Sequence, residues 1–344
     1  MREVFLAGVG ATAFGGASRV PGSLAAEAVE AALGDAGMTV GDLTSATVGG
    51  RHRPGGRLAT ALDGTTVLGR PSPWAGRAVH RAWQAVAAGG HDVVLCVGEG
   101  TAPAGGHHLI LQAEAARRYM ARSGATPEHL AQITVKNRTV GADNPRALSG
   151  GRVDIADVLA SEVVAWPLRR LMVAQGAAGA AAVVLASREG LQRAGGQALR
   201  VGASVLVADG DIEVAVARAA RLGYQGARMG PEDLDCAELD DRTAAGELAA
   251  YEAVQFVPAG QGPELVESGF TALGGVLPVN ASGGLLSRGD TAGASCLAQL
   301  CELAWQLRGQ AGPRQVVAAA AGMSVSGYDD DGDHAFVSLF VLRT

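Results

Sequence analysis

The chain has 344 residues, a formal net charge of −6, an apolar fraction of 48% and a charged fraction of 18%. This composition supplies enough apolar material for a buried core and excludes wholesale disorder. The 28 basic residues are scattered and are outnumbered by 34 acidic ones, which argues against a nucleic-acid or anionic-membrane surface. The 50 glycines follow no G-X-Y period, so a collagen-like chain is excluded as well.

In the first part of the chain, apolar strand patterns alternate with helical ones. We predict strands at 3–15, 44–50 and 91–100, and helices at 23–38 and 76–90. The segment that follows, 101–165, interrupts this alternation because it contains two helical patterns but few strands. Those helices are expected at 113–124 and 127–138, and a strand at 177–187 restores the alternation.

A second round of alternation begins at residue 198. We predict strands at 198–210, 235–241, 276–280, 314–323 and 334–344, and helices at 211–224, 243–256 and 292–310. The tripeptide Ala-Trp-Gln occurs twice, at 82–84 and 304–306, each time at the end of a helix that precedes a Gly-rich turn and a strand. The pattern therefore predicts two similar α/β halves with largely parallel sheets covered by helices.

We divide the chain accordingly into three parts. The N-terminal half comprises residues 1–100 plus 166–190, the inserted region comprises 101–165, and the C-terminal half comprises 196–344.

Groups with intrinsic reactivity are few. The four cysteines have no C-x-x-C spacing and lie in apolar segments, which predicts buried, reduced thiols; they are Cys96, Cys236, Cys296 and Cys301. Lys136 is the only lysine, so any Schiff-base chemistry would have to use it. The pair His107-His108 has no third ligand at metal spacing, and no metal is expected.

The N-terminal segment does not have the pattern of a secretory signal. Charges at Arg2 and Glu3 precede a strand pattern, and no long apolar region follows them. No run reaches the roughly 18 apolar residues of a membrane span. We expect a cytoplasmic protein.

Residues 279–309 contain the most informative motif. A strand leads into the turn Gly283-Gly284, and a second Gly-containing loop then leads into a helix. Such a turn can present backbone N–H groups to an anionic oxygen. The alternative is an ordinary strand-to-helix turn.

This block resembles the signature of the lipid-transfer-type (sterol-carrier-protein) thiolases, within the thiolase superfamily. Four further segments resemble that family in the same order along the chain. They are 116–122, 135–138 with Asn144-Pro145, 159–169 and 266–269. The resemblance implies an α/β thiolase fold, in which two repeated βαβαβαββ halves form five αβαβα layers, and a dimer. It also implies that region 101–165 covers an acyl-CoA site, with Lys136 and Asn137 in the covering segment.

The sequence departs from the family pattern at the catalytic positions. Ser72 lies nearest to the position of the family's nucleophilic Cys, and Asp290 occupies the position of its oxyanion-hole His. Asp240 lies near the position of the Asn or His that orders a water. The second catalytic Cys is replaced within 332–335. We therefore expect no ordinary thiolase chemistry, since a carboxylate repels a developing oxyanion and an unpartnered serine is a weak nucleophile.

Other residues near these positions could support a different reaction. We predict Asp290, Tyr328, His334 and Asp240 as catalytic residues, because carboxylates, Tyr and His can take a proton from a hydroxyl or protonate an enolate. Burial beside Asp240, together with like-charge repulsion, should raise the pKa of one of the two carboxyls. Asp290 is slightly favoured as the general base.

Each of these residues also has a plainer interpretation. Asp240 and Asp241 could cap the following helix, with Thr243 as the competing cap. His334 could lie at the surface. The Asp329–Asp331 run could be a solvated turn.

Two functions remain open, with a third behind them. The first is retro-aldol cleavage of a β-hydroxyacyl-CoA, as in steroid side-chain aldolases of the resembled group, which work with a small OB-fold/zinc-ribbon partner. The second is a non-catalytic subunit of a heteromeric thiolase or aldolase-type complex. The third is an acyltransferase that uses Ser72. A pocket plugged by a large side chain such as Trp74 would favour the subunit.

The remaining expectations concern ligands and assembly. We predict Ser72, Lys136, Asn137, Gly283 and Gly284 as substrate-binding residues. No cofactor is expected apart from CoA as part of the substrate. The chain is expected to form a homodimer, or a heterodimer with a thiolase-like chain.

Overall fold

The computed structural model describes residues 1–15, 23–50, 56–62, 64–72, 74–101, 108–148, 151–291, 293–330 and 334–344. For residues 56–57, 108, 328–330 and 334–339 it describes the main chain alone.

The elements of the N-terminal half are β1 (Phe5–Ala11), α1 (Ser23–Ala36), β2 (Ser45–Gly49), α2 (Gly56–Leu62), α3 (Ala75–Ala87), β3 (Val93–Thr101) and β6 (Ala178–Ala186). The segment between β3 and β6 forms α4 (His108–Ser123), α5 (Pro127–Gly141), α6 (Ile155–Ala160) and the short hairpin β4 (Val163–Ala165) with β5 (Leu168–Arg169).

The elements of the C-terminal half are β7 (Leu199–Asp209), α7 (Ile212–Ala227), β8 (Cys236–Glu238), α8 (Ala244–Ala253), α9 (Gly262–Glu267), α10 (Gly284–Arg288), α11 (Ser295–Leu307), β9 (Ala321–Asp330) and β10 (His334–Arg343). Short 3₁₀ turns lie at Val40–Asp42, Arg170–Met172, Gly190–Arg193, Pro231–Asp233 and Gly312–Arg314.

Eight described strands form one sheet in the order β2-β3-β6-β1-β7-β10-β9-β8, and this order confirms the predicted repeat. In the first half β2 and β3 are parallel, while β6 is antiparallel to both β3 and β1. The second half repeats this arrangement, with β8 and β9 parallel and β10 antiparallel to both β9 and β7. The halves join where β1 pairs with β7 at Leu6 and Leu199.

A further strand of each half is reduced to isolated parallel bridges. Val67 and Ser72 bridge to β2, and Val279 bridges to β8. With these bridges each half follows the predicted βαβαβαββ order.

Two details of the sequence prediction were wrong. The sheet is not largely parallel, because β6 and β10 each run antiparallel between two neighbours. The strand expected at 314–323 begins only at Ala321 and extends to Asp330, because that run is the one that pairs with β10 along its whole length.

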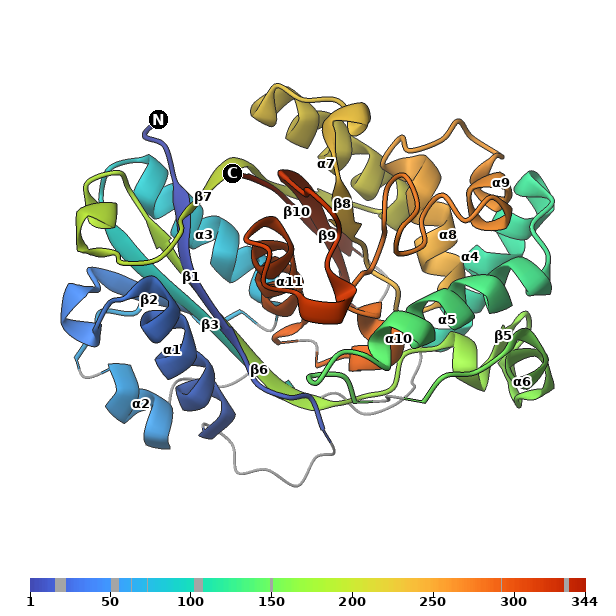
Figure 1. Cartoon of the computed structure of the whole chain (residues 1–344), viewed down its shortest axis with the longest axis horizontal. Helices are drawn as coiled ribbons and strands as arrows, with labels where there is room; N and C mark the ends of the chain where they lie inside the picture. Colours follow the sequence, from blue (N-terminus) through green and yellow to red (C-terminus); the bar gives the residue numbers. More distant parts are fainter. Residues whose placement is uncertain are drawn as a thin grey trace.

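The layers follow from how the helices are arranged around the sheet (Figure 1). Helices α3 and α11, which carry the repeated tripeptide, share one core with strands of both halves. Helix α1 packs on the outer face of the first half, and α7 with α8 packs on the outer face of the second. Helix α1 approaches β1 so closely that a Cβ at Gly8 would collide with the main chain of α1.

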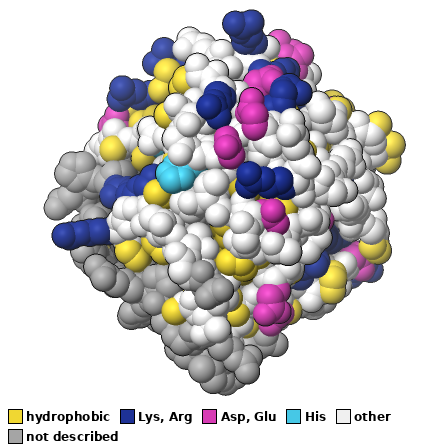
Figure 2. Space-filling view, turned by 90° about the vertical axis from the view of Figure 1, so that its left-hand side faces the viewer, with side chains coloured by type: hydrophobic (Ala, Val, Ile, Leu, Met, Phe, Trp, Pro, Cys, Tyr) yellow, Lys and Arg dark blue, Asp and Glu magenta, His cyan; other side chains and the backbone are white. Residues whose placement is uncertain are grey.

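The charged side chains on one face of the molecule are interspersed in sign. Over its described atoms, Lys/Arg and Asp/Glu side chains alternate with apolar ones, and neither sign dominates (Figure 2). This distribution agrees with the scattered basic residues of the sequence.

Candidate functional site

A largely apolar cleft of about 160 Å³ lies between α4, α7, α8 and β9. Alanines and a glycine of α8 and alanines of α4 form much of its wall. Its lining includes six polar or charged residues, which are Gln112, Tyr119, Glu213, Asp240, Arg242 and Thr243.

Arg242 connects the two carboxylates that the sequence analysis singled out. Its Nη2 lies 3.0 Å from Oδ2 of Asp240, and its Nε lies 3.4 Å from Oδ2 of Asp290. Nη2 also donates to the carbonyl of Gly327 on β9. The predicted proximity of Asp240 and Asp290 is therefore present, but a guanidinium joins the two carboxylates. We call these three side chains, Asp240, Arg242 and Asp290, the cleft triad.

The loops on both sides hold the triad in place. Asp240 Oδ2 accepts a hydrogen bond from Gly327 N at 3.0 Å. Asp290 lies between α10 and α11, where its Oδ1 accepts from Ser295 Oγ at 2.9 Å. The main chain of Asp290 also bonds to Gln175 and Ala177. Of the two carboxylates, Asp240 lines the cleft and Asp290 is not among the lining residues.

Burial raises the pKa of Asp240 above its usual value. The charge of Asp290 acts in the same direction, while the guanidinium of Arg242 opposes it. The predicted pKa rise of one carboxyl thus falls on Asp240. Helix α8 is capped by Thr243 Oγ1, which accepts from Gly246 N at 3.1 Å, so neither aspartate provides that side-chain cap.

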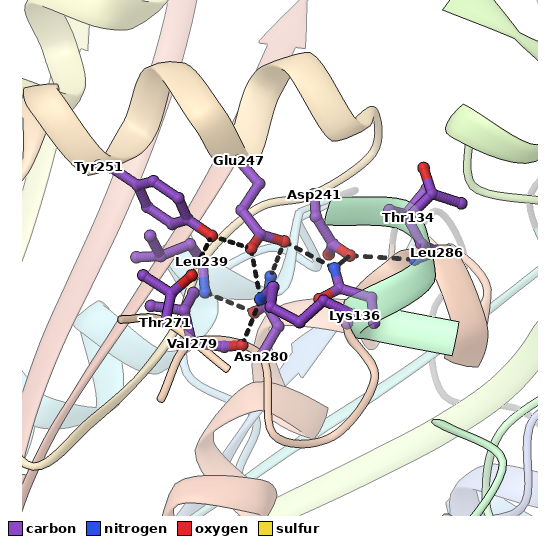
Figure 3. Close-up of polar contacts among 12 residues, drawn as sticks. Thr134, Lys136, Leu239, Asp241, Glu247, Tyr251, Thr271, Val279, Asn280 and Leu286 are labelled. Atoms are coloured by element: carbon purple, nitrogen blue, oxygen red, sulfur yellow. Dashed lines mark hydrogen bonds and ion pairs between the residues drawn. The ribbon is translucent and has the colours of Figure 1, made fainter. Parts of the chain in front are cut away.

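A second set of polar side chains forms a closed network next to the triad (Figure 3). Glu247, which is fully buried, accepts hydrogen bonds from Asn137, Tyr251 and Asn280. Lys136 Nζ lies 2.7 Å from Glu247 Oε1 and donates to the carbonyl of Val279.

Asn137 connects Glu247 to Asp241. Its Nδ2 donates to Asp241 Oδ2 at 2.8 Å and to Glu247 Oε2 at 2.6 Å, and the whole side chain is buried. We call Lys136, Asn137, Asp241, Glu247, Tyr251 and Asn280 the closed network. Lys136 and Asn137 remain predicted substrate-binding residues, but their observed partners belong to this protein.

After the turn at Gly283-Gly284, the first N–H groups of α10 bond to a carboxyl group of the chain itself, and burial raises the pKa of that carboxyl, Asp241, well above its usual value. Asp241 accepts from Leu285 N at 2.6 Å and from Leu286 N at 3.2 Å. Gly284 has φ of +61°, and a Cβ there would collide with the Asp241 carboxylate.

The remaining predicted residues lie as follows. Ser72 is buried, and its Oγ accepts from the N–H of Trp74, a buried residue that directly precedes α3. Tyr328 and His334 lie on β9 and β10, paired in register with Phe336 and Asp330, and their side chains are outside the described residues. Neither Ser72 nor Trp74 is among the residues that line the cleft.

All four cysteines are buried and unbridged, as predicted. They lie on β3, β8 and α11, and none of them belongs to α3 or to the residues directly before it. Burial raises the pKa of Cys96 and of Cys301 to about 12, so these thiols are weak nucleophiles near neutral pH. Among the described residues, no three His, Cys, Asp or Glu side chains come together in a way that could hold a metal ion.

Arg242 was not predicted as a site residue from the sequence. The only available signal was its place directly after two aspartates in a strand-to-helix loop. Its link to Asp290 spans 48 positions and depends on the tertiary fold.

Comparisons with known proteins agree with this architecture. A family model described as "Thiolase C-terminal domain-like" matches residues 203–328. The chain is 33% identical to an acetyl-CoA acetyltransferase of Methanothermobacter thermautotrophicus, over 94% of this chain and 96% of that protein. It is 36% identical to human sterol carrier protein 2 over 60% of this chain, a match that spans only 40% of that longer protein.

A solved structure described as an Ltp2-ChsH2(DUF35) aldolase has the same fold. It superimposes with a TM-score of 0.87 at 24% identity, covering 99% of this chain and 98% of that one. None of the described helices has the length and apolar character needed to cross a bilayer. From the matched relatives and the repeated thiolase architecture, the chain belongs to the lipid-transfer type of the thiolase superfamily.

Proposed function

We propose that this chain cleaves a carbon–carbon bond of a β-hydroxyacyl-CoA by a retro-aldol reaction. The observation that carries the proposal is the pair Asp240 and Arg242 on the wall of an apolar cleft in a thiolase fold. No cysteine lies at the start of α3, and the predicted loss of the thiolase nucleophile and histidine is part of the proposal.

Asp240 acts as the general base. A carboxylate whose pKa is raised by burial lies nearer to the working pH, which makes it a better proton acceptor. It takes the proton of the β-hydroxyl, the Cα–Cβ bond breaks, and a carbonyl product and a thioester enolate form. The same proton then returns from Asp240 to Cα, so the reaction needs no cofactor beyond the CoA of the substrate.

Arg242 stabilises the negative charge that develops on the thioester oxygen. A cation fixed in a partly buried site is worth more than in water, because little solvent has to reorganise. Asp290 fixes the guanidinium from behind through the contact to Nε. This assignment moves the general base from Asp290, which the sequence slightly favoured, to Asp240, the carboxylate that lines the cleft.

The proposal includes a small OB-fold/zinc-ribbon partner and a dimeric assembly. The partner is supported by the likeness to a solved structure whose description names a DUF35 component. The dimer is an expectation from the family resemblance alone. Sedimentation at micromolar concentration tests the assembly, and a single species near 35 kDa that recruits no partner would contradict it.

The second candidate is a non-catalytic subunit. The observation in its favour is that the guanidinium of Arg242 is already paired with Asp240 and Asp290 within the chain, and so needs no substrate as a partner. In that case substitutions in the cleft triad leave the activity of a reconstituted complex within a few-fold of wild type.

The deciding experiment follows products by mass spectrometry. The chain, alone and reconstituted with an OB-fold/zinc-ribbon protein, is incubated with β-hydroxyacyl-CoAs of increasing acyl size. We expect a shortened acyl-CoA and an equimolar carbonyl product, both lost in Asp240→Asn but kept in Glu162→Gln, which alters an exposed carboxylate paired with Arg170. Cleavage that is unaffected by Asp240→Asn would contradict the proposal.

A further inference from the structure

Asp240 and Asp241 are neighbours in the chain, yet their carboxylates have different partners. Asp240 lines the cleft, whereas Asp241 is fully buried and contacts the first turn of α10. Helix α10 ends at Arg288, two residues before Asp290. The hydrogen bonds from α10 to Asp241 therefore connect the loop that carries Asp240 and Arg242 with the loop that carries Asp290.

We infer that Asp241 is a positioning residue, which clamps α10 and thereby sets the distance between Arg242 and Asp290. The kinetic test of this inference rests on the proposed function, whereas its structural test does not. Two N–H groups of α10 converge on one carboxylate, an arrangement that resists both sliding and rotation of the helix.

The closed network holds Asp241 from the other side. Asn137 donates both amide hydrogens, one to Asp241 and one to Glu247, and a flipped amide would place its oxygen against two carboxylates. Its own Oδ1 is buried with no hydrogen-bond partner among the described atoms. A buried acceptor without a partner costs about 1–3 kcal/mol, so this arrangement maintains the geometry at some expense in stability.

The glycine at position 284 makes the clamp possible. Its left-handed conformation and missing Cβ leave room for the carboxylate of Asp241 beside the turn. Gly284→Ala should therefore displace the carboxylate without changing any charge. Gly274→Ala is the matched control, since Gly274 also has positive φ, at +88°, but a Cβ there would meet nothing within 4 Å.

The kinetic test uses Gly284→Ala and Asp241→Asn. A misplacement of about 1 Å in a catalytic group costs roughly 10²-fold in rate. We expect kcat/KM to fall about 10–100-fold in both variants, and to stay within about 2-fold of wild type in Gly274→Ala.

The pH profile separates positioning from simple loss of stability. The charged or titratable groups near Asp240 are Arg242, Asp290 and Asp241, whose own pKa is raised by burial, and Glu213 lines the same cleft. When Asp290 moves away from Arg242, its charge no longer raises the pKa of Asp240. The acidic limb of the kcat/KM profile should then shift to lower pH in Gly284→Ala, and should not shift in Gly274→Ala.

The structural test needs no substrate. In a crystal structure of Asp241→Asn, the Arg242 Nε–Asp290 Oδ2 distance should lengthen from 3.4 Å to beyond 4 Å. An unchanged distance would overturn the inference, and so would a Gly284→Ala pH profile that matches wild type. If the wild-type chain cleaves no β-hydroxyacyl-CoA, the proposed function fails, and the crystallographic distance still decides the inference.

Discussion

The cleft triad and the closed network lie side by side and contain the same kinds of groups, yet they differ in access. The triad keeps about a fifth to a quarter of each side chain exposed, at 21% for Asp240, 26% for Arg242 and 20% for Asp290. Glu247, at the centre of the network, has no exposed side-chain surface. Carboxylates paired with cations can therefore take part in a reaction at the triad and stabilise the fold in the network. The difference depends on whether the carboxylate is accessible to a ligand.

The largest effect should come from the carboxylate that lines the cleft. Removing a general base costs about 10²–10⁴-fold in rate, and we expect that loss in kcat for Asp240→Asn. Asp290→Asn should cost only about 10-fold, because Asp290 acts through Arg242. Steady-state kinetics on a β-hydroxyacyl-CoA measures both, and equal losses would remove the distinction between the two carboxylates.

The second largest loss of activity is expected for substitutions of Arg242. In Arg242→Ala two partly buried carboxylates lose their shared cation, and we expect a loss of about 10²–10³-fold in kcat/KM. Arg242→Lys keeps the charge but cannot contact both carboxylates through a planar fork, so an intermediate loss should result. An Arg242→Lys variant as active as wild type would show that charge alone suffices.

Glu238, a buried carboxyl outside the closed network, tests through stability how a carboxyl without access to the cleft behaves. Burial, with the charge of Glu302, raises the pKa of Glu238 to about 7. When the pKa of a carboxyl is higher in the folded than in the unfolded state, its contribution to the free energy of unfolding is complete below the unfolded-state pKa of about 4.5. That contribution is lost as the pH rises through the folded-state pKa of about 7. The loss amounts to about 3 kcal/mol, and Glu238→Gln should abolish it.

Urea unfolding between pH 5 and pH 8 measures this effect. Ser282 N and Oγ donate to the two oxygens of Glu238. In Glu238→Gln the amide oxygen can still accept from Ser282 N, whereas the amide NH2 can only donate to Ser282 Oγ. The exposed Glu162→Gln is the control. A pH slope that persists unchanged in Glu238→Gln would contradict the assignment.

The smallest effect is expected at Ser72, the residue nearest the family's nucleophile position. Its hydroxyl is buried against the start of α3 and does not line the cleft. Ser72→Ala should leave kcat within about 2-fold, because a serine without a partnered base is a weak nucleophile. Incubation with acetyl-CoA should give no adduct on the Ser72 peptide, and a stoichiometric acetyl adduct would revive the acyltransferase.

The repeated α/β architecture could be predicted from the sequence, because the patterns that indicate helices and strands are local. The tripeptide repeat at 82–84 and 304–306 marked the two helices that share the central core. Strand direction was less accessible, since β6 returns through a long insertion and pairs between β1 and β3.

The site was only partly predictable. Two carboxylates could be placed together by their positions in a family pattern, and the rise in the pKa of Asp240 follows from their burial. The cation between them could not be predicted, because the Arg242–Asp290 contact joins two loops that approach only in the folded protein. Lys136 and Asn137 have no sequence feature that separates a ligand contact from a buried partner such as Glu247.

In the proposed mechanism Asp240 takes and returns a proton, while Arg242 stabilises the CoA-thioester enolate, and hydrogen exchange at Cα measures this step. The reverse proton transfer can be followed by incubating the chain with acetyl-CoA in D₂O and measuring deuterium at Cα by mass spectrometry. The account predicts exchange by the wild-type chain, reduced at least about 10²-fold in Asp240→Asn and unchanged in Glu162→Gln. Exchange no faster than in buffer, or equal in wild type and Asp240→Asn, would contradict it.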